Sequence, residues 1–275
     1  MTLGTSVADD WAPQGAGRAA PSSVPAADHA LARDLAARAG ELLLRVRAQW
    51  DGDAAGLKDA GDRQAHELLV EALAAERPDD GVLSEEGRDD HARLAKQRVW
   101  IVDPLDGTRE FSEVPRDDWA VHVALAVDGL PVAGAVARPA RADVLATDRP
   151  PVVPERAPGP LRLAVSRSRP PAFVVELAEF LDAELVPMGS AGIKATAVVD
   201  GVVDAYVHAG GQYEWDSAAP VAVALSAGLF ASRIDGSPLT YNHADPLLPD
   251  LVIARPEVAG LVLNAIRTIG KGTTS

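Results

Sequence analysis

Two acids and a hydroxyl stand close together where an apolar run of the chain ends. Residues 99–102 are apolar, Asp103 follows them directly, and Asp106 and Thr108 come three and five residues later. Pro104 interrupts regular hydrogen bonding between the acids, because its ring fixes the backbone and its nitrogen carries no hydrogen. The carboxylates suit a hard divalent cation such as Mg²⁺, and a helix that starts just after them suits an anion. The segment therefore predicts a site that holds a cation and an anion together.

Three further acids suit the same chemistry, and each also has a plain structural explanation. Asp62 suits the N-cap of a helix. Glu85 lies in an acidic loop, and most such loops are merely solvated. Asp216 follows Trp215 and suits a helix start, with Pro220 near the first turn, where proline is best tolerated. The metal interpretation is favoured for the pair in the apolar segment, and for these three acids both explanations stay open at this point.

The composition limits the classes of function. The chain has 275 residues with 26 Lys+Arg and 40 Asp+Glu, a formal net charge of −14. This charge disfavours nucleic-acid and anionic-membrane partners, whereas a small phosphorylated substrate can bind where metal ions neutralise a site. The absence of cysteine excludes disulfides and thiol catalysis. No apolar run reaches the ~18 residues of a membrane span and no signal-peptide pattern opens the chain, so we expect a cytoplasmic protein.

Helices and strands must position these acids, and the pattern of apolar residues predicts where they lie. Residues 1–27 lack periodicity and predict a disordered tail. Apolar residues at helical spacing predict one helix from Asp28 onward and a second helix that begins at Asp62. Strand-like segments around the acids, joined by a turn at Gly129–Pro131, predict an antiparallel meander.

A proline-rich stretch divides the predicted elements into two groups. Residues 149–160 contain five prolines and predict the boundary between the halves. Residues 28–150 read as an α+β half that carries most of the candidate acids. In residues 151–275 strands and helices alternate, which favours an α/β half that supplies Asp216. One helix of this half is expected to be capped by Ser190.

The acidic segment resembles a known family signature. Asp103–Thr108 resembles the Asp-Pro-x-Asp-Gly-Thr element of the inositol monophosphatase superfamily. Glu85 resembles the first acid of its upstream Glu-Glu element, and Trp215–Ala219 resembles its downstream Trp-Asp element. Their order and spacing agree with the superfamily over roughly residues 29–270. The resemblance implies the layered α-β-α-β-α fold of these sugar phosphatases.

The residues after the signature resemble one subfamily more than the others. Arg109–Phe111 resembles the Lys/Arg-Glu-Phe of CysQ-type 3′(2′),5′-bisphosphate nucleotidases, whereas inositol monophosphatases more often have Thr-Asn-Phe there. Pro115–Trp119 and His208–Gln212 resemble the actinobacterial CysQ branch. The resemblance implies release of the 3′-phosphate from 3′-phosphoadenosine 5′-phosphate (PAP) to give AMP, with 3′-phosphoadenylyl sulfate as a second substrate. It also implies a place in sulfur assimilation and inhibition by Li⁺.

Two other functions are compatible with the same motifs. An inositol-1-phosphate or fructose-1,6-bisphosphate phosphatase would use the same metals, because the shared chemistry recognises phosphate and metal more than the leaving group. A non-catalytic sensor of phosphorylated metabolites built on this fold is a different class. The presence of every expected acid argues against the sensor. A homodimer is left open as the assembly.

The resemblance also implies a role for each site residue. The oxygen ligands implied for two or three Mg²⁺ ions come from Glu85, Asp103, Leu105 (through its carbonyl), Asp106 and Asp216. Thr108, paired with Asp62, orients and helps deprotonate the attacking water, and Glu85 assists. Main-chain N–H groups at the start of the next helix hold the phosphate. The implied substrate contacts are Gly107, Thr108, Arg109, Gly189, Ser190 and Lys194.

Some positions depart from the family pattern or have plainer explanations. Asp59 stands where the family usually has Thr, and it either adds charge near a metal or faces solvent. Lys194 is equally explained as an exposed helical lysine. His122 lies in a strand-like run, where we expect a satisfied core or edge histidine rather than a ligand. Arg109 and Glu110 either shape a nucleotide pocket or pair with each other at the surface, where such a pair contributes little.

Overall fold

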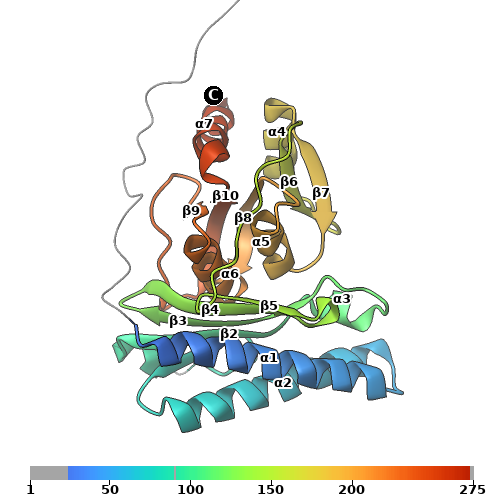
Figure 1. The fold of residues 1–275 in the computed structure, drawn as a ribbon, viewed down its shortest axis with the longest axis vertical. Coiled ribbons are helices and arrows are strands. Elements are labelled where there is room, and N and C mark those ends of the chain that lie inside the picture. Colours follow the sequence, from blue (N-terminus) through green and yellow to red (C-terminus); the bar gives the residue numbers. More distant parts are fainter. Residues whose placement is uncertain (1–23, 90, 273–275) are drawn as a thin grey trace, which may run out of the picture.

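The computed structural model describes residues 24–89 and 91–272. The predicted tail at 1–27 therefore lies outside the described residues except for its last four, of which Ala26 and Ala27 already belong to the first helix. Two five-stranded sheets alternate with helices in layers (Figure 1). This arrangement confirms the predicted α-β-α-β-α order.

The first sheet is a meander with one parallel strand at its edge. Its strands, in spatial order, are β1 (Gly81–Ser84), β2 (Arg98–Asp106), β3 (Ala120–Val127), β4 (Leu130–Arg138) and β5 (Asp143–Ala146). β1 runs parallel to β2, and the remaining neighbours are antiparallel. The predicted meander is confirmed, but the β3–β4 turn consists of Asp128 and Gly129, and Pro131 already pairs within β4.

The second sheet is mixed. Its strands, in spatial order, are β7 (Glu184–Met188), β6 (Arg162–Ser166), β8 (Ala205–Tyr213), β10 (Leu247–Ala254) and β9 (Phe230–Ser232). β6 is parallel to β7 and β8, whereas β10 is antiparallel to β8 and β9. The predicted alternation of strands and helices in this half is confirmed, with β9 as an additional short edge strand.

Helices cover both faces of both sheets (Figure 1). α1 (Ala26–Gln49) and α2 (Ala54–Glu76) lie on the outer face of the first sheet. α5 (Ala191–Val199) and α6 (Glu214–Ser226) lie between the sheets, and α4 (Ala172–Leu181) and α7 (Pro256–Gly272) cover the second sheet. The short helices are α3 (Thr108–Ser112), η1 (Ala92–Ala95) and η2 (Pro139–Arg141). None of the described helices is long and apolar enough to cross a membrane.

Alternation along the strands explains the layers. On β2, Trp100 and Val102 pack with α1 and α2, whereas Val99 and Ile101 belong to the core between the sheets. Successive side chains of a strand point to opposite faces, and a sheet buried on both faces needs nearly continuous apolar strands. β3 follows this rule in every position except His122.

Two predicted helix starts are wrong. α2 begins at Ala54, and the side chain of Asp53 caps it by accepting a 2.8 Å hydrogen bond from Gly56 N. Asp62 therefore lies inside the helix and does not cap it. Gly61, a residue type more common in loops than in helices, is explained here by close packing, because a Cβ there would lie 2.8 Å from Cε1 of Phe111.

The second wrong start is that of α6. This helix begins at Glu214, so Pro220 lies in its interior rather than near the first turn. Asp216 is in the first turn, where its carboxylate accepts a 2.7 Å hydrogen bond from Tyr213 N. Pro220 supplies no N–H to the carbonyl four residues earlier.

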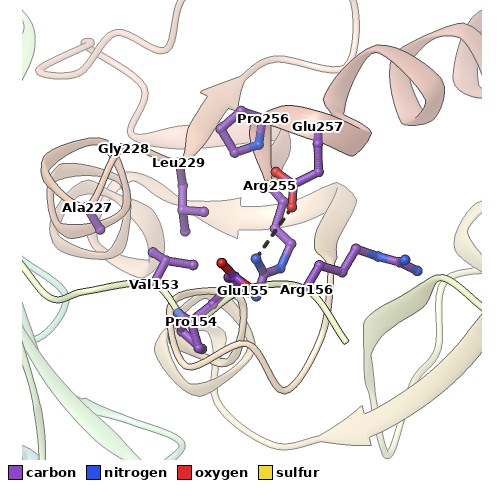
Figure 2. Close-up of a pocket in the computed structure, with 10 residues that line it drawn as sticks. All are labelled: Val153, Pro154, Glu155, Arg156, Ala227, Gly228, Leu229, Arg255, Pro256 and Glu257. Atoms are coloured by element: carbon purple, nitrogen blue, oxygen red, sulfur yellow. Dashed lines mark hydrogen bonds and ion pairs between the residues drawn. The ribbon is translucent and has the colours of Figure 1, made fainter. Parts of the chain in front are cut away.

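The proline-rich stretch 149–160 connects the two sheets, and the division into halves at residue 150 stays a prediction. Residues 153–156 of this stretch line a pocket of about 300 Å³ together with the α6–β9 turn and the start of α7 (Figure 2). Arg255 is buried there and donates to Pro154 O at 2.9 Å, while Arg156 lies 3.2 Å from Asp204. The cations of the pocket are therefore paired within the chain, and none of its ten lining residues is a predicted site residue.

Candidate active site

A bulge at the end of β2 brings its two acids to the same face of the sheet. In a regular strand, residues three apart point to opposite faces. Asp103 pairs with His122 and Asp106 pairs with Ala120, so the register shifts between the two acids. An extra residue in one strand reverses the facing of the side chains beyond it, and Leu105 accordingly joins the core on the α1–α2 side. Both carboxylates therefore reach the space near α5 and α6.

Acids from further places in the chain complete this cluster. One carboxylate oxygen from each of Asp103, Asp106 and Asp216 lies within 4.8 Å of the others. Glu85, which follows β1, forms a side-chain hydrogen bond with Asp103. The first turn of α6 carries Asp216, and the parallel pairing of β1 with β2 brings Glu85 beside the bulge. The structure thus brings together the side chains of the four predicted acidic ligands.

The acids of the cluster disfavour one another's charge. Burial, followed by the charge of Glu85, raises the pKa of Asp103. Glu85 is exposed as a residue, but desolvation of its carboxyl group beside the other acids, followed by the charge of Asp216, raises its pKa to about 7. Burial and the charge of Asp106 raise the pKa of Asp216 to about 6. The cluster offers many oxygen atoms and lacks positive charge to balance its carboxylates. It therefore fits a hard divalent cation, which takes carboxylate and carbonyl oxygens.

Asp106 differs from the other acids because the chain itself compensates its charge. Its oxygens accept hydrogen bonds from Ala191 N at 2.9 Å, from Gly192 N at 2.6 Å and from the Ser190 hydroxyl. These donors form the N-terminus of α5, where helix N–H groups favour negative charge. Burial opposes ionisation, but His122 and the Ser190 hydroxyl together lower the pKa of Asp106 to about 2.

His122 is fully buried between the end of β2, which carries Asp106, and the first turn of α6. Its Nε2 lies 3.2 Å from Asp106 Oδ2, and its Nδ1 lies 3.0 Å from the carbonyl oxygen of Trp215. Burial opposes a charged ring, but the carboxylate of Asp106 raises the pKa of His122. The expected burial is confirmed and Nδ1 has a hydrogen-bond partner, whereas Nε2 contacts Asp106 at ion-pair distance without a hydrogen bond of good geometry, so the expectation of a fully satisfied ring is wrong.

Thr108 and Asp62 face each other beside the acids. The Thr108 hydroxyl lies 3.4 Å from Asp62 Oδ1 and 3.1 Å from the Leu105 carbonyl oxygen. Burial and the charge of Glu86 raise the pKa of Asp62 to about 7, although the hydrogen bond from Thr108 opposes this shift. A carboxyl group with this pKa next to a hydroxyl can hold or take a proton near neutral pH. Asp59, one turn earlier in α2, is exposed and is not grouped with Asp103, Asp106 and Asp216.

Known proteins match nearly the whole chain. The profile of the family described as "Inositol monophosphatase family" matches residues 27–152 and 154–270. The chain belongs to the inositol monophosphatase family. This family is metal-dependent, which agrees with the donor set of the acidic cluster.

Relatives within the inositol monophosphatase family carry names of nucleotide phosphatases. The chain is 57% identical over 237 residues to a 3′-phosphoadenosine 5′-phosphate phosphatase from Mycobacterium tuberculosis, covering 83% of this chain and 89% of that one. It is 31% identical over 235 residues to the 3′(2′),5′-bisphosphate nucleotidase CysQ of Escherichia coli K12, covering 78% and 94%. The solved structure of CysQ from Bacteroides thetaiotaomicron superposes with a TM-score of 0.70 at 28% identity, covering 83% and 97%. The predicted family, fold and phosphatase class are confirmed.

The predicted substrate contacts of this inositol monophosphatase family member lie in two places. A Cβ at Gly107, whose φ is 87°, would lie 3.2 Å from the Cβ of Ser190, so the starts of α3 and α5 adjoin at the acids. Lys194 is 7% exposed and is not a surface lysine, because its Nζ lies 2.5 Å from the Ser190 carbonyl oxygen and 3.4 Å from that of Gly189. Burial lowers the pKa of Lys194. Arg109 is exposed and pairs with Glu113, directly after α3, rather than with Glu110.

An ion-pair network next to Gly189 has no signal in the sequence. Asp118 accepts a 2.8 Å hydrogen bond from Gly189 N and lies 2.9 Å from Arg116 and 2.7 Å from Arg167. Glu110 joins this network through Arg116 at 3.3 Å. No spacing in the sequence connects these residues, because they come from the segment before β3, from α3 and from the end of β6. The network fixes the loop that precedes α5.

Proposed function

We propose that the chain is a Mg²⁺-dependent phosphatase that removes the 3′-phosphate of PAP and leaves AMP. The observation that carries this substrate is the 57% identity, over most of both chains, to a PAP phosphatase. The reaction type is supported by the convergence of four carboxyl groups beside a hydroxyl that faces a fifth. Sites of this kind hold two metal ions for in-line displacement at phosphorus.

The proposed metal ligands are those that the family signature supplies. The oxygens that would hold the ions belong to Glu85, Asp103, Leu105 (through its carbonyl), Asp106 and Asp216. When bound, two divalent cations lower the pKa of water and stabilise negative charge on the attacking and leaving oxygens. The choice of Mg²⁺ follows from the all-oxygen donor set, since sulfur and a ligating imidazole are absent from it.

Thr108 and Asp62 move the proton in the proposed mechanism. The Thr108 hydroxyl orients the attacking water, accepts a proton from it and donates its own proton to Asp62. The raised pKa of Asp62 suits this task near neutral pH. The water oxygen bonds to phosphorus as the bond from phosphorus to the 3′ oxygen breaks. The 3′ oxygen leaves with that electron pair and takes a proton from solvent. Glu85 assists by remaining ionised beside the water, and no side chain becomes phosphorylated.

Two helix starts are proposed to bind the substrate. Main-chain N–H groups of Gly107 and Thr108 would hold the phosphate that is transferred. Gly189 and Ser190 would contact the rest of the nucleotide, and the buried ammonium of Lys194 supports them by holding their carbonyl oxygens.

Arg109 is proposed as an outer contact, because its charge is exposed at the rim. It has an alternative partner in Glu113, directly after α3, at 2.9 Å.

The proposal extends to properties that are implied by the same relatives. We propose that 3′-phosphoadenylyl sulfate is a second substrate, that the enzyme serves sulfur assimilation, and that Li⁺ inhibits it. Cytoplasmic location and a homodimer belong to the same proposal.

A direct comparison of substrates tests the proposed function. The catalytic efficiency kcat/KM is measured with Mg²⁺ on PAP, inositol-1-phosphate and fructose-1,6-bisphosphate, using release of inorganic phosphate. We expect PAP to give the highest value. A higher value on inositol-1-phosphate or fructose-1,6-bisphosphate would overturn PAP as the preferred substrate but would leave the proposed phosphatase reaction standing. The absence of phosphate release from all three would overturn the catalytic function and favour a sensor.

A further inference from the structure

His122 connects the two parts of the chain that supply the acids. It lies on β3 opposite Asp103, and its side chain is 0% exposed. Nε2 faces Asp106, at the end of β2, at a distance of 3.2 Å. Nδ1 faces the carbonyl oxygen of Trp215, the residue before Asp216, at 3.0 Å. One ring therefore contacts one acid directly and the main chain next to another.

The surrounding atoms leave the ring no freedom. A Cβ at Gly192 would overlap His122 Nε2, so the first turn of α5 packs directly against the imidazole. Gly192 N donates at 2.6 Å to the same carboxylate oxygen of Asp106 that faces His122. Nδ1 also lies 3.9 Å from Asp103 Oδ2. A ring fixed in this way transmits the position of α6 to the end of β2.

Such a link matters because the acids repel one another. Asp106 ends a strand of the first sheet, whereas Asp216 belongs to a helix between the sheets. Without a connection, like charges at this spacing favour separation of the two elements. Groups that hold metal ligands in place affect metal affinity without touching the metal.

We propose that His122 is a positioning residue of the metal site, which holds Asp106 and the Trp215–Asp216 main chain at the spacing that a bound cation requires. The inference rests on the proposed function, because it takes these acids as metal ligands. His122 is not itself a ligand in this proposal. Its effect is on the affinity for the cation, and not on the proton transfer at Thr108.

Two conservative variants separate the two polar contacts of the ring. In His122→Asn the amide nitrogen lies where Nδ1 was and keeps the bond to Trp215, but it cannot reach Asp106. In His122→Gln the longer amide reaches Asp106 and gives up the bond to Trp215. His122→Phe removes both contacts at similar size. The matched control is His29→Asn, because His29 also makes a side-chain hydrogen bond between distant segments, at 2.7 Å to Thr147, which follows β5, three strands away from β2.

Binding of Mn²⁺ to the full chain without substrate is the first measurement, with the free ion quantified by electron paramagnetic resonance. We expect His122→Asn and His122→Gln each to weaken Mn²⁺ binding by about 10–100-fold, the usual effect of losing a group that orients a ligand. The His29→Asn control should bind as the wild type does. In phosphate-release assays, the Mg²⁺ concentration for half activity should rise by a similar factor, while kcat at saturating Mg²⁺ stays within a few-fold.

The outcomes distinguish this inference from the proposed function. If the wild type binds no Mn²⁺, the metal site itself is wrong. If the wild type binds Mn²⁺ and both conservative variants bind it equally well, only the role of His122 is overturned. A fall in kcat with unchanged metal affinity would also overturn it. Because the two amide variants each preserve one polar contact, the test does not depend on whether His122→Phe folds.

Discussion

Replacing Thr108 with alanine tests how the site moves a proton. The hydroxyl lies 3.4 Å from Asp62 Oδ1 and 3.1 Å from the Leu105 carbonyl oxygen, and it has one hydrogen to donate. Proton transfer by a positioned side chain typically contributes about 10²–10⁴-fold in rate. We expect kcat of Thr108→Ala to fall by that factor. The loss of one partly buried hydrogen bond costs only about 0.5–1.5 kcal/mol of folding free energy, so the fold should persist.

The assay is the initial rate of phosphate release from PAP at saturating Mg²⁺, with thermal unfolding measured in parallel. Thr108→Ser keeps the hydroxyl and should retain most of the turnover. Ser112→Ala is a matched control, because it removes a hydroxyl from the same short helix whose bond is to Arg109 O at 2.9 Å. This variant should turn over as the wild type does.

A double-mutant cycle with Asp62→Asn then asks whether the two residues act as one unit. If Asp62 accepts the proton through Thr108, removing both should cost no more than the more damaging single change. The acid limb of the kcat profile should also disappear in Asp62→Asn, because the base must be ionised to act. Bound cations favour the carboxylate and move this limb below the pKa of about 7 that the chain alone gives. Multiplicative losses, or a Thr108→Ala rate within a few-fold of wild type, would refute the pairing.

Three further predictions concern the acids and the loop beside them. Asp103→Asn should weaken Mn²⁺ binding at least tenfold and depress turnover severely; near-wild-type turnover at saturating Mg²⁺ would remove it from the ligands. In EDTA, urea unfolding should show stability falling from pH 4 to pH 7, because the raised pKa values of Asp62 and Glu85 make the folded chain bind more protons than the unfolded one; a rise over this window would contradict the shifts. Lys194→Met should lower kcat/KM about 10–100-fold, since a hydrogen bond from a charged group contributes about 1.5–3 kcal/mol; an unchanged value would leave the lysine without a role in the loop.

The local order of residues predicted the elements that carry the acids. The apolar run before Asp103, and the Gly-Thr pair after Asp106, are enough to predict a buried strand followed by a helix. Ser190 was predicted as a helix cap, and its hydroxyl accepts from Ile193 N at 3.0 Å. These features depend on neighbours in the chain, which a sequence displays directly.

Contacts between segments that are distant in the sequence could not be predicted from local residue patterns. The start of α2 was misplaced because Gly61 reads as a loop residue, whereas it is required by the approach of Phe111 from α3. The importance of His122 was hidden because β3 is apolar on both faces, so alternation alone does not say which face the ring takes. Asp118 is bound to Gly189 across 71 residues, and no periodicity connects them.

The charge state of Asp106 shows how this site differs from a simple group of acids. The α5 N-terminus donates hydrogen bonds to Asp106, the imidazole of His122 lies 3.2 Å from it, and the pKa of Asp106 is lowered to about 2. Asp103 lies in a different environment, where burial and the charge of Glu85 raise its pKa. Asp106 is therefore held ionised by the chain and anchors α5, which lies between the sheets, to the end of β2. The negative charges of Asp103, Glu85 and Asp216 are not balanced in this way, so a bound cation would stabilise them most. The proposed metal site is thus built around one acid whose position the fold has already fixed.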